Sequence, residues 1–135
     1  MGTRFLIDTN ILIYYIGNVI PQASVKKMNQ IIAETFNISI ISKIEFLGWH
    51  RYTENDYGKA VKFIRSAVVI PLKDKIIAQT ISVKRKHNIK LPDAVIAATC
   101  LIDEYTLVTR NVRDFDKISG LRFYNPFAVK KLKSK

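Results

Sequence analysis

The sequence predicts a three-layer α/β fold in which helices cover both faces of a central, mostly parallel five-stranded sheet. Short, continuously apolar segments alternate along the chain with longer segments whose apolar residues recur at helical spacing. The short segments lack an apolar–polar alternation, which is typical of strands buried on both faces of a parallel sheet. The 135 residues suffice for one ordinary domain with its own core.

The N-terminal part of the chain predicts two strands and two helices. Residues 4–7 form an apolar run that predicts the first strand, and a helix is expected over 10–16, ended by Gly17. Pro21 opens a second helical segment with apolar residues at helical spacing. Residues 37–41 are apolar and largely β-branched, which predicts the second strand.

The middle of the chain continues this alternation. We expect a helix over 42–52, and a further helix over 53–66 in which Thr53 is the cap. Residues 68–70 predict a third strand. Residues 73–87 predict a helix whose apolar positions form only a rough stripe.

The C-terminal part predicts the remaining elements. Pro92 is expected as the first residue of a helix that runs to about residue 102, because proline is well tolerated there. Residues 106–109 and 121–124 predict the fourth and fifth strands, with a short turn or helix over 112–118 between them.

Charge is the most informative property of the composition. Twenty-two Lys and Arg oppose eleven Asp and Glu, so the formal net charge is +11. Such an excess favours a polyanionic partner, which could be nucleic acid, an acidic protein or a membrane surface. We divide the chain into one domain over 1–126 and a basic C-terminal tail over 127–135, expected to be a solvated end.

No segment resembles a targeting signal or a membrane span. The apolar stretch over 5–16 is interrupted by Asp8 and Asn10 and is too short to cross a bilayer. The single cysteine, Cys100, cannot form an internal disulfide, which suits a reducing compartment. We therefore expect a soluble cytoplasmic protein without a membrane partner.

Four acidic residues lie where a parallel sheet places its ligands. Asp8 ends the first predicted strand, Glu45 lies in the first turn of the helix after the second, and Asp114 follows the fourth. Asp93 lies in the first turn of the helix that Pro92 opens, and could face the same edge. Carboxylates gathered there repel one another unless a hard cation such as Mg²⁺ or Mn²⁺ neutralises them. Metal held in this way can promote phosphodiester hydrolysis.

Each acid also has a structural interpretation. Ser42 and Glu45 have the spacing of a capping box. Asp93 could interact with its helix dipole, Asp8 could cap the helix that follows it, and Asp114 could be a turn residue. These roles do not exclude metal binding.

Other chemistries find less support in the sequence. A zinc site would need clustered ligands, but His50, His87 and Cys100 are isolated from one another. Only five glycines are present, and they form no phosphate-binding loop. No motif supports a Ser-His-Asp or Cys-His nucleophile.

Four segments together resemble the PIN domain family. They are FLIDTNIL at 5–12, ISKIEFLG at 41–48, LPDAVIAAT at 91–99 and LVTRNVRDF at 107–115. The resemblance extends from residue 5 to about 126 and implies a PIN-like three-layer fold with metal-dependent ribonuclease activity. It assigns Mg²⁺ or Mn²⁺ binding to four acids and a supporting role to two polar residues. The acids are Asp8, Glu45, Asp93 and Asp114, and the supporting residues are Asn10 and Thr109. Asp116 lies outside the family pattern.

A PIN domain of this length is similar to the VapC-type toxins of type II toxin–antitoxin pairs. That similarity implies a homodimer that cuts RNA and is inhibited by a small antitoxin protein. Asp8 and Asp93 are expected as central ligands, with Arg110 and Arg113 as contacts to RNA phosphates. Alternatives are an RNA-processing PIN nuclease outside such a pair, or a PIN domain that binds RNA or a protein without cutting. Another is a phosphatase that forms an aspartyl-phosphate, although Asn10 occupies the position where such enzymes need a second acid.

Overall fold

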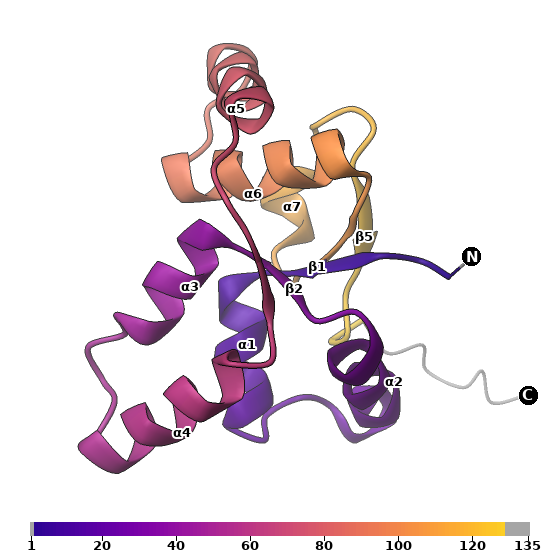
Figure 1. Cartoon of the computed structure of the whole chain (residues 1–135). Coiled ribbons are helices and arrows are strands. Elements are labelled where there is room, and N and C mark those ends of the chain that lie inside the picture. The colour runs from indigo at the N-terminus through magenta and orange to yellow at the C-terminus, as the bar shows by residue number, and fades with distance from the viewer. Residues whose placement is uncertain (1, 129–135) are drawn as a thin grey trace, which may run out of the picture.

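The structure is a computed structural model that describes residues 2–128. Within them, five strands form one sheet in the order β3-β2-β1-β4-β5, and every neighbouring pair is parallel (Figure 1). The strands are β1 (Phe5–Ile7), β2 (Asn37–Ser39), β3 (Val68–Ile70), β4 (Thr106–Val108) and β5 (Arg122–Tyr124). The helices are α1 (Thr9–Ile16), α2 (Gln22–Glu34), α3 (Ile40–Leu47), α4 (Glu54–Ile64), α5 (Asp74–Lys86), α6 (Leu91–Asp103) and α7 (Val112–Phe115). The predicted α/β class is confirmed, and the sheet is wholly parallel.

The sheet separates two hydrophobic cores. Leu6 and Leu107 point from the central strands into the core that α5, α6 and α7 cover. Their neighbours Ile7 and Val108 point into the opposite core, which α1, α2, α3 and α4 complete. Figure 1 shows α5, α6 and α7 on one side of the sheet, and α1, α2 and α4 on the other. Because successive strand residues face opposite sides, both faces must be apolar, as the unbroken apolar runs predicted.

The order of the strands creates a crevice beside β1. After β1 the chain adds β2 and β3 on one side, then returns to add β4 and β5 on the other. Ligands of open parallel sheets bind at such a reversal, beyond the carboxyl ends of the strands. Asp8 follows β1, and Thr109 follows β4, so both residues border this crevice.

The boundary between β2 and α3 differs from the prediction. The strand expected over 37–41 ends at Ser39, whose side chain accepts a hydrogen bond of 3.2 Å from the N–H of Ile41 and so caps α3. The expected helix start at Ser42 is therefore wrong, and Ser42 lies buried inside the helix. Local β propensity favoured a longer strand, but the serine cap and the packing of Ile41 against the core start the helix earlier. The helix also ends at Leu47, before Gly48, rather than near residue 52.

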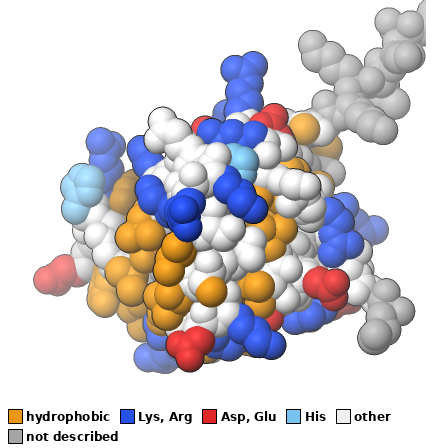
Figure 2. Space-filling model, turned by 90° about the horizontal axis from the view of Figure 1, so that it is seen from above, with side chains coloured by type: hydrophobic (Ala, Val, Ile, Leu, Met, Phe, Trp, Pro, Cys, Tyr) orange, Lys and Arg blue, Asp and Glu red, His pale blue; other side chains and the backbone are white. Residues whose placement is uncertain are grey.

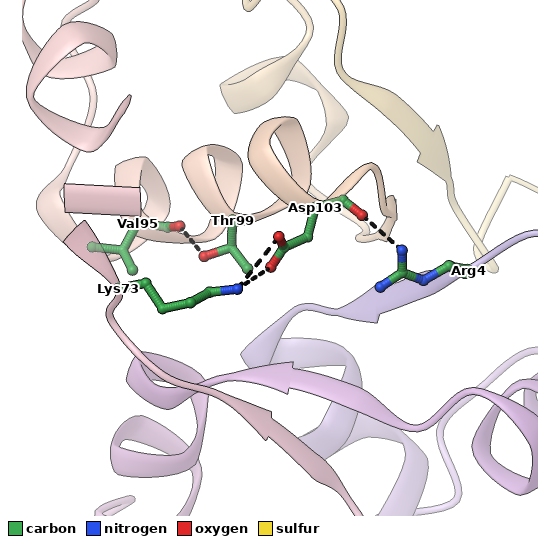
Figure 3. Close-up of polar contacts among 5 residues, drawn as sticks. All are labelled: Arg4, Lys73, Val95, Thr99 and Asp103. Carbon is green, nitrogen blue, oxygen red and sulfur yellow. Dashed lines mark hydrogen bonds and ion pairs between the residues drawn. The ribbon is translucent and has the colours of Figure 1, made fainter. Parts of the chain in front are cut away.

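Polar contacts at the opposite end of the sheet tie α5, α6 and β1 together (Figure 3). Lys73, just before α5, forms an ion pair of 3.1 Å with Asp103 at the end of α6, and the Arg4 guanidinium donates to the Asp103 carbonyl at 3.1 Å. The Lys73 side chain is 49% exposed, so this ion pair adds little to stability. Apolar packing positions α6, whose residues from Ala94 to Cys100 are all buried.

Ordered packing continues to the end of the described residues. Ser24 donates a hydrogen bond of 2.6 Å to the Pro126 carbonyl, and the Phe127 ring packs edge-on against Tyr14 with 5.2 Å between ring centroids. Of the predicted tail over 127–135, the part from 129 onward lies outside the described residues. No helix in the described part has the length and apolar character needed to cross a membrane.

Candidate functional site

Asp8 lies at the crevice between β1 and β4. Its backbone N–H donates to the Val108 carbonyl at 3.0 Å, which continues the pairing of the two strands. Its side chain accepts hydrogen bonds from the N–H of Thr9 at 2.8 Å and from the hydroxyl of Thr109 at 2.9 Å. Asp8 therefore caps α1, as one interpretation of the sequence proposed, and is also fixed to the end of β4.

Asp8 is 5% exposed, and the pKa of its carboxyl is raised from 3.8 to about 6. Burial is the largest cause, because it penalises the ionised form. The hydrogen bond from Thr109 opposes the rise and the charge of Asp93 adds to it, with smaller contributions from Thr9 and Glu45. Carboxyls whose pKa is displaced toward neutrality concentrate at functional sites.

Glu45 reaches the same crevice from α3. The hydroxyl of Thr9 donates to its carboxylate at 2.8 Å and also lies 3.0 Å from the hydroxyl of Ser42. The capping-box interpretation of Ser42 and Glu45 is wrong, because α3 begins at Ile40 and Ser39 is its cap. Glu45 consequently lies in the second turn of α3, and its hydrogen bond joins this helix to the start of α1.

Asp93 and Asp114 complete the group of acids. Asp93 lies in the first turn of α6 and is half-buried, while Asp114 is exposed on α7. Burial raises the pKa of Asp93, and the charges of Asp114 and Glu45 raise it further, while Lys90 partly offsets the rise. This mutual influence means that four segments distant in sequence place their carboxylates around one space.

That space is a pocket of about 410 Å³. Its lining comprises Asp8, Thr9, Asn10, Glu45, Asn88, Ile89, Lys90, Pro92, Asp93, Asn111, Arg113, Asp114 and Lys117. The lining thus includes all four predicted acids, the supporting Asn10 and the predicted phosphate contact Arg113. Thr109, fully buried, lies behind Asp8 and holds it. Asp116 is exposed and is not part of the lining.

Arg110 is directed elsewhere. Its guanidinium lies 4.3 Å from the ring centroid of Phe127 and 5.6 Å from that of Tyr14, and it is not among the lining residues. Sequence reasoning also did not assign Thr9, Lys90 and Lys117 to the site, although they line the pocket. Lys90 and Lys117 lie one turn from the acids Asp93 and Asp114, a spacing that could have indicated them. The hydrogen bond from Thr9 to Glu45 of α3 joins residues that are far apart in sequence, so no local pattern could have predicted it.

The donor set suits a hard divalent cation. All four acids offer carboxylate oxygens, the ligands that Mg²⁺ and Mn²⁺ prefer, and neither histidine lines the pocket. Within residues 2–128, no three acidic, histidine or cysteine side chains already surround a single point as ligands would. Ionised carboxylates repel one another, and a cation bound between them would offset this repulsion. The Cys100 thiol is buried and burial raises its pKa, which makes it a poor nucleophile.

The raised pKa of Asp8 predicts how stability depends on pH without metal. Ionising Asp8 costs more in the folded protein than in the unfolded chain, so its contribution is lost as pH rises from about 4 to about 6. Asp8→Asn removes this titration. Its free energy of unfolding should therefore rise relative to the original chain by roughly 1–3 kcal/mol between pH 4 and 7. Urea denaturation in chelator measures this, with the exposed Asp116→Asn as the control for net charge. A difference that does not change with pH would refute the assignment.

Comparison with known proteins places this geometry in a family. A family model described as PIN domain matches residues 5–121. A chain of a toxin–antitoxin complex from Klebsiella pneumoniae is 26% identical, with a TM-score of 0.72, over 93% of this chain and 99% of that chain. A chain of DNA-bound VapBC from Salmonella typhimurium is 24% identical, with a TM-score of 0.78, over 93% of this chain and 99% of that chain.

A third structure supports the same fold. A chain of VapBC2 from Rickettsia felis, bound to a DNA fragment from its promoter, is 22% identical with a TM-score of 0.75, over 91% of this chain and 98% of that chain. No curated protein sequence matches the chain. Because the family model extends from the start of β1 to the residue before β5 and includes every segment that contributes an acid to the pocket, the chain belongs to the PIN domain family.

Proposed function

We propose that this PIN domain is a metal-dependent endoribonuclease that hydrolyses RNA phosphodiester bonds. One observation carries the proposal: four carboxylates from separate segments line one pocket at the crevice of the sheet, inside a protein of net charge +11. PIN domains are generally nucleases, and this chain retains an acidic pocket as well as an excess of cations for a polyanion. The buried Asp8 argues for a ligand, because burial penalises its charged form and a cation bound beside it would offset that penalty.

Asp8 and Asp93 would hold Mg²⁺ or Mn²⁺ at the centre of the pocket. Asp8 is fixed by two hydrogen bonds and Asp93 by the first turn of α6, so neither depends on a flexible loop. Glu45, oriented by Thr9, would complete the ligand set or accept a proton from the attacking water. Asp114, which is exposed on α7, would support a second ion or orient the RNA.

When bound, a divalent cation supplies the charge that activates a water and stabilises the leaving oxygen. The protein's own contribution is to place the groups around that water. Thr109 keeps Asp8 ionised, because its hydrogen bond favours the charged form. Protonation of Asp8 below its pKa of about 6 would compete with metal, so metal affinity should fall in acid. An aspartyl-phosphate is disfavoured, because enzymes that form one need a second acid two residues on, and this chain has Asn10 there.

The nuclease proposal predicts RNA cleavage that requires metal and depends on the pocket acids. Purified protein should cut single-stranded or structured RNA in Mg²⁺ or Mn²⁺, and chelator should abolish cleavage. Asp93→Asn and Asp114→Asn should each lower the rate, Asp93→Asn by at least about 100-fold, because they remove groups that hold the metal. Gel analysis of labelled RNA measures the rate.

Asp116→Asn is the matched control, because Asp116 lies two residues from Asp114 on the sequence but outside the pocket. It should cleave at the original rate. If Asp93→Asn cleaves normally, the activity arises from a contaminant or from another site. If folded protein binds RNA but cuts none, the proposal fails in favour of a PIN domain that binds without cutting.

The same pocket would make the chain the toxin of a type II toxin–antitoxin pair. This part of the proposal is supported by neighbours whose structures are toxin–antitoxin complexes. A small antitoxin protein would cover the acidic pocket and inhibit cleavage in the cytoplasm. The chain would act as a homodimer. An RNA-processing nuclease without an antitoxin is the alternative.

A growth assay tests the toxin proposal. Induced expression of the chain alone should arrest bacterial growth, and co-expression of a small protein encoded beside its gene should restore growth. That protein should co-purify with the chain, and light scattering of the free chain gives its oligomeric state. Asp93→Asn should be harmless when expressed alone. Unimpaired growth with a chain that is active on RNA in vitro would favour the RNA-processing role.

A further inference from the structure

We propose that RNA on one side of the cleaved bond follows a basic wall that runs from the pocket onto the end of α5. The basic wall consists of Lys84, Arg85, Lys86, Lys90, Arg113 and Lys117. This inference rests on the proposed nuclease function. It adds the direction in which the RNA leaves the pocket, because the cations lie to one side of the acids.

The pocket lining is asymmetric in charge. Lys90, at the start of α6, and Arg113 and Lys117, on or just after α7, all line it. The facing part of the lining, contributed by α1 and α3, includes Asn10 and Glu45 but no cation. A polyanion that enters the pocket is therefore attracted from the side of α6 and α7.

Hydrogen bonds from two lysines connect the parts of the basic wall. The Lys84 ammonium, in the last turn of α5, donates to the Ile89 carbonyl at 2.8 Å. The Lys117 ammonium donates to the Asn88 carbonyl at 3.4 Å. The connection between α5 and α6 is thus held from both sides, and Ile89 anchors it with only 7% of its surface exposed. The end of α5 is in this way joined to the rim of the pocket.

No carboxylate neutralises this connection along the sequence. Residues 75–92 contain five cations and no acid. The one ion pair within residues 2–128, Lys73–Asp103, lies at the other end of α6. Figure 2, which views the molecule from above α5, shows Lys and Arg side chains gathered over this face. The wall cations of residues 84–90 therefore form no ion pair in the described part of the chain, whereas Arg113 and Lys117 are adjacent in sequence to Asp114 and Asp116.

Helix stability accounts for only part of the wall. Cations in the last turn of α5 interact favourably with the helix dipole, so Lys84, Arg85 and Lys86 have that structural role. Lys90, in contrast, occupies the N-cap position of α6, where the helix dipole makes a cation unfavourable. Lys90 favours the charged form of the neighbouring Asp93, and the helix dipole does not account for its position, so Lys90 is also placed to contact a phosphate at the rim of the pocket.

A matched pair of double variants tests the wall. Arg85→Gln/Lys86→Gln removes two wall cations outside the pocket, and Lys62→Gln/Arg65→Gln removes one Lys and one Arg from the end of α4. The two helices cover opposite faces of the sheet, and all four residues are exposed. Both double variants have the same net charge. Circular dichroism and thermal unfolding verify that each one folds.

Fluorescence anisotropy with a short labelled single-stranded RNA gives the dissociation constant as a function of salt, in Mg²⁺ and in an Asp93→Asn background that prevents cleavage. The wall variant should lose about 1.4 from the slope of log affinity against log salt, and roughly tenfold in affinity at about 0.1 M salt. The α4 variant should keep the original slope. Equal losses in both variants, or none in the wall variant, would overturn the proposal.

Cleavage by the chain without substitutions separates this outcome from failure of the nuclease proposal. If the wall variant alone loses RNA affinity but the original chain cuts no RNA in any metal, the wall stands and the nuclease proposal fails. If the original chain cuts RNA and the wall variant binds and cuts it like the α4 variant, the nuclease stands and the wall fails.

Discussion

The burial of one carboxylate, that of Asp8, is the constraint on which the site depends. A parallel sheet whose strand order reverses beside β1 leaves a crevice there, and Asp8 is the first residue past the strand. Its enclosure raises its pKa to about 6, while hydrogen bonds from Thr9 and Thr109 favour the charged form. The same hydrogen bonds join the start of α1 to the end of β4. The residue that is costly to bury is therefore also the one that fixes the geometry of the crevice.

The topology of the chain brings the other acids close to Asp8. α3 follows β2 and brings Glu45 to Thr9, while α6 crosses the opposite face with Asp93 in its first turn. The result is a concentration of negative charge inside a protein of net charge +11. Cations lie on one side of this negative charge, so the electrostatic potential around the pocket is positive on that side and negative at the centre. In such a field, a polyanion would be attracted to the rim, while the proposed metal cation would be favoured at the centre.

The fold class, nearly every element and the four acids follow from the sequence, because they rest on apolar periodicity and on where parallel strands end. What the sequence did not reveal depends on contacts between distant segments. The start of α3 at Ile40 was missed because two isoleucines favour a strand locally, while a serine cap and core packing favour a helix. The contact of Arg110 with RNA stays a prediction, whereas the position of its guanidinium over the ring of Phe127 depends on a partner that only the folded chain brings near. The role of Thr9 as a bridge to Glu45 likewise leaves no trace in local spacing.

The central claim is that the acids hold a divalent cation between them, and crystals soaked in Mn²⁺ test it most directly. An anomalous difference map recorded at the manganese absorption edge locates the ion without reference to activity. The account predicts a peak within coordination distance of Asp8 and Asp93, with Glu45 or Asp114 drawn toward it, and no peak in crystals of Asp93→Asn. A pocket without manganese at millimolar concentration and neutral pH, or a peak on other residues, would contradict it.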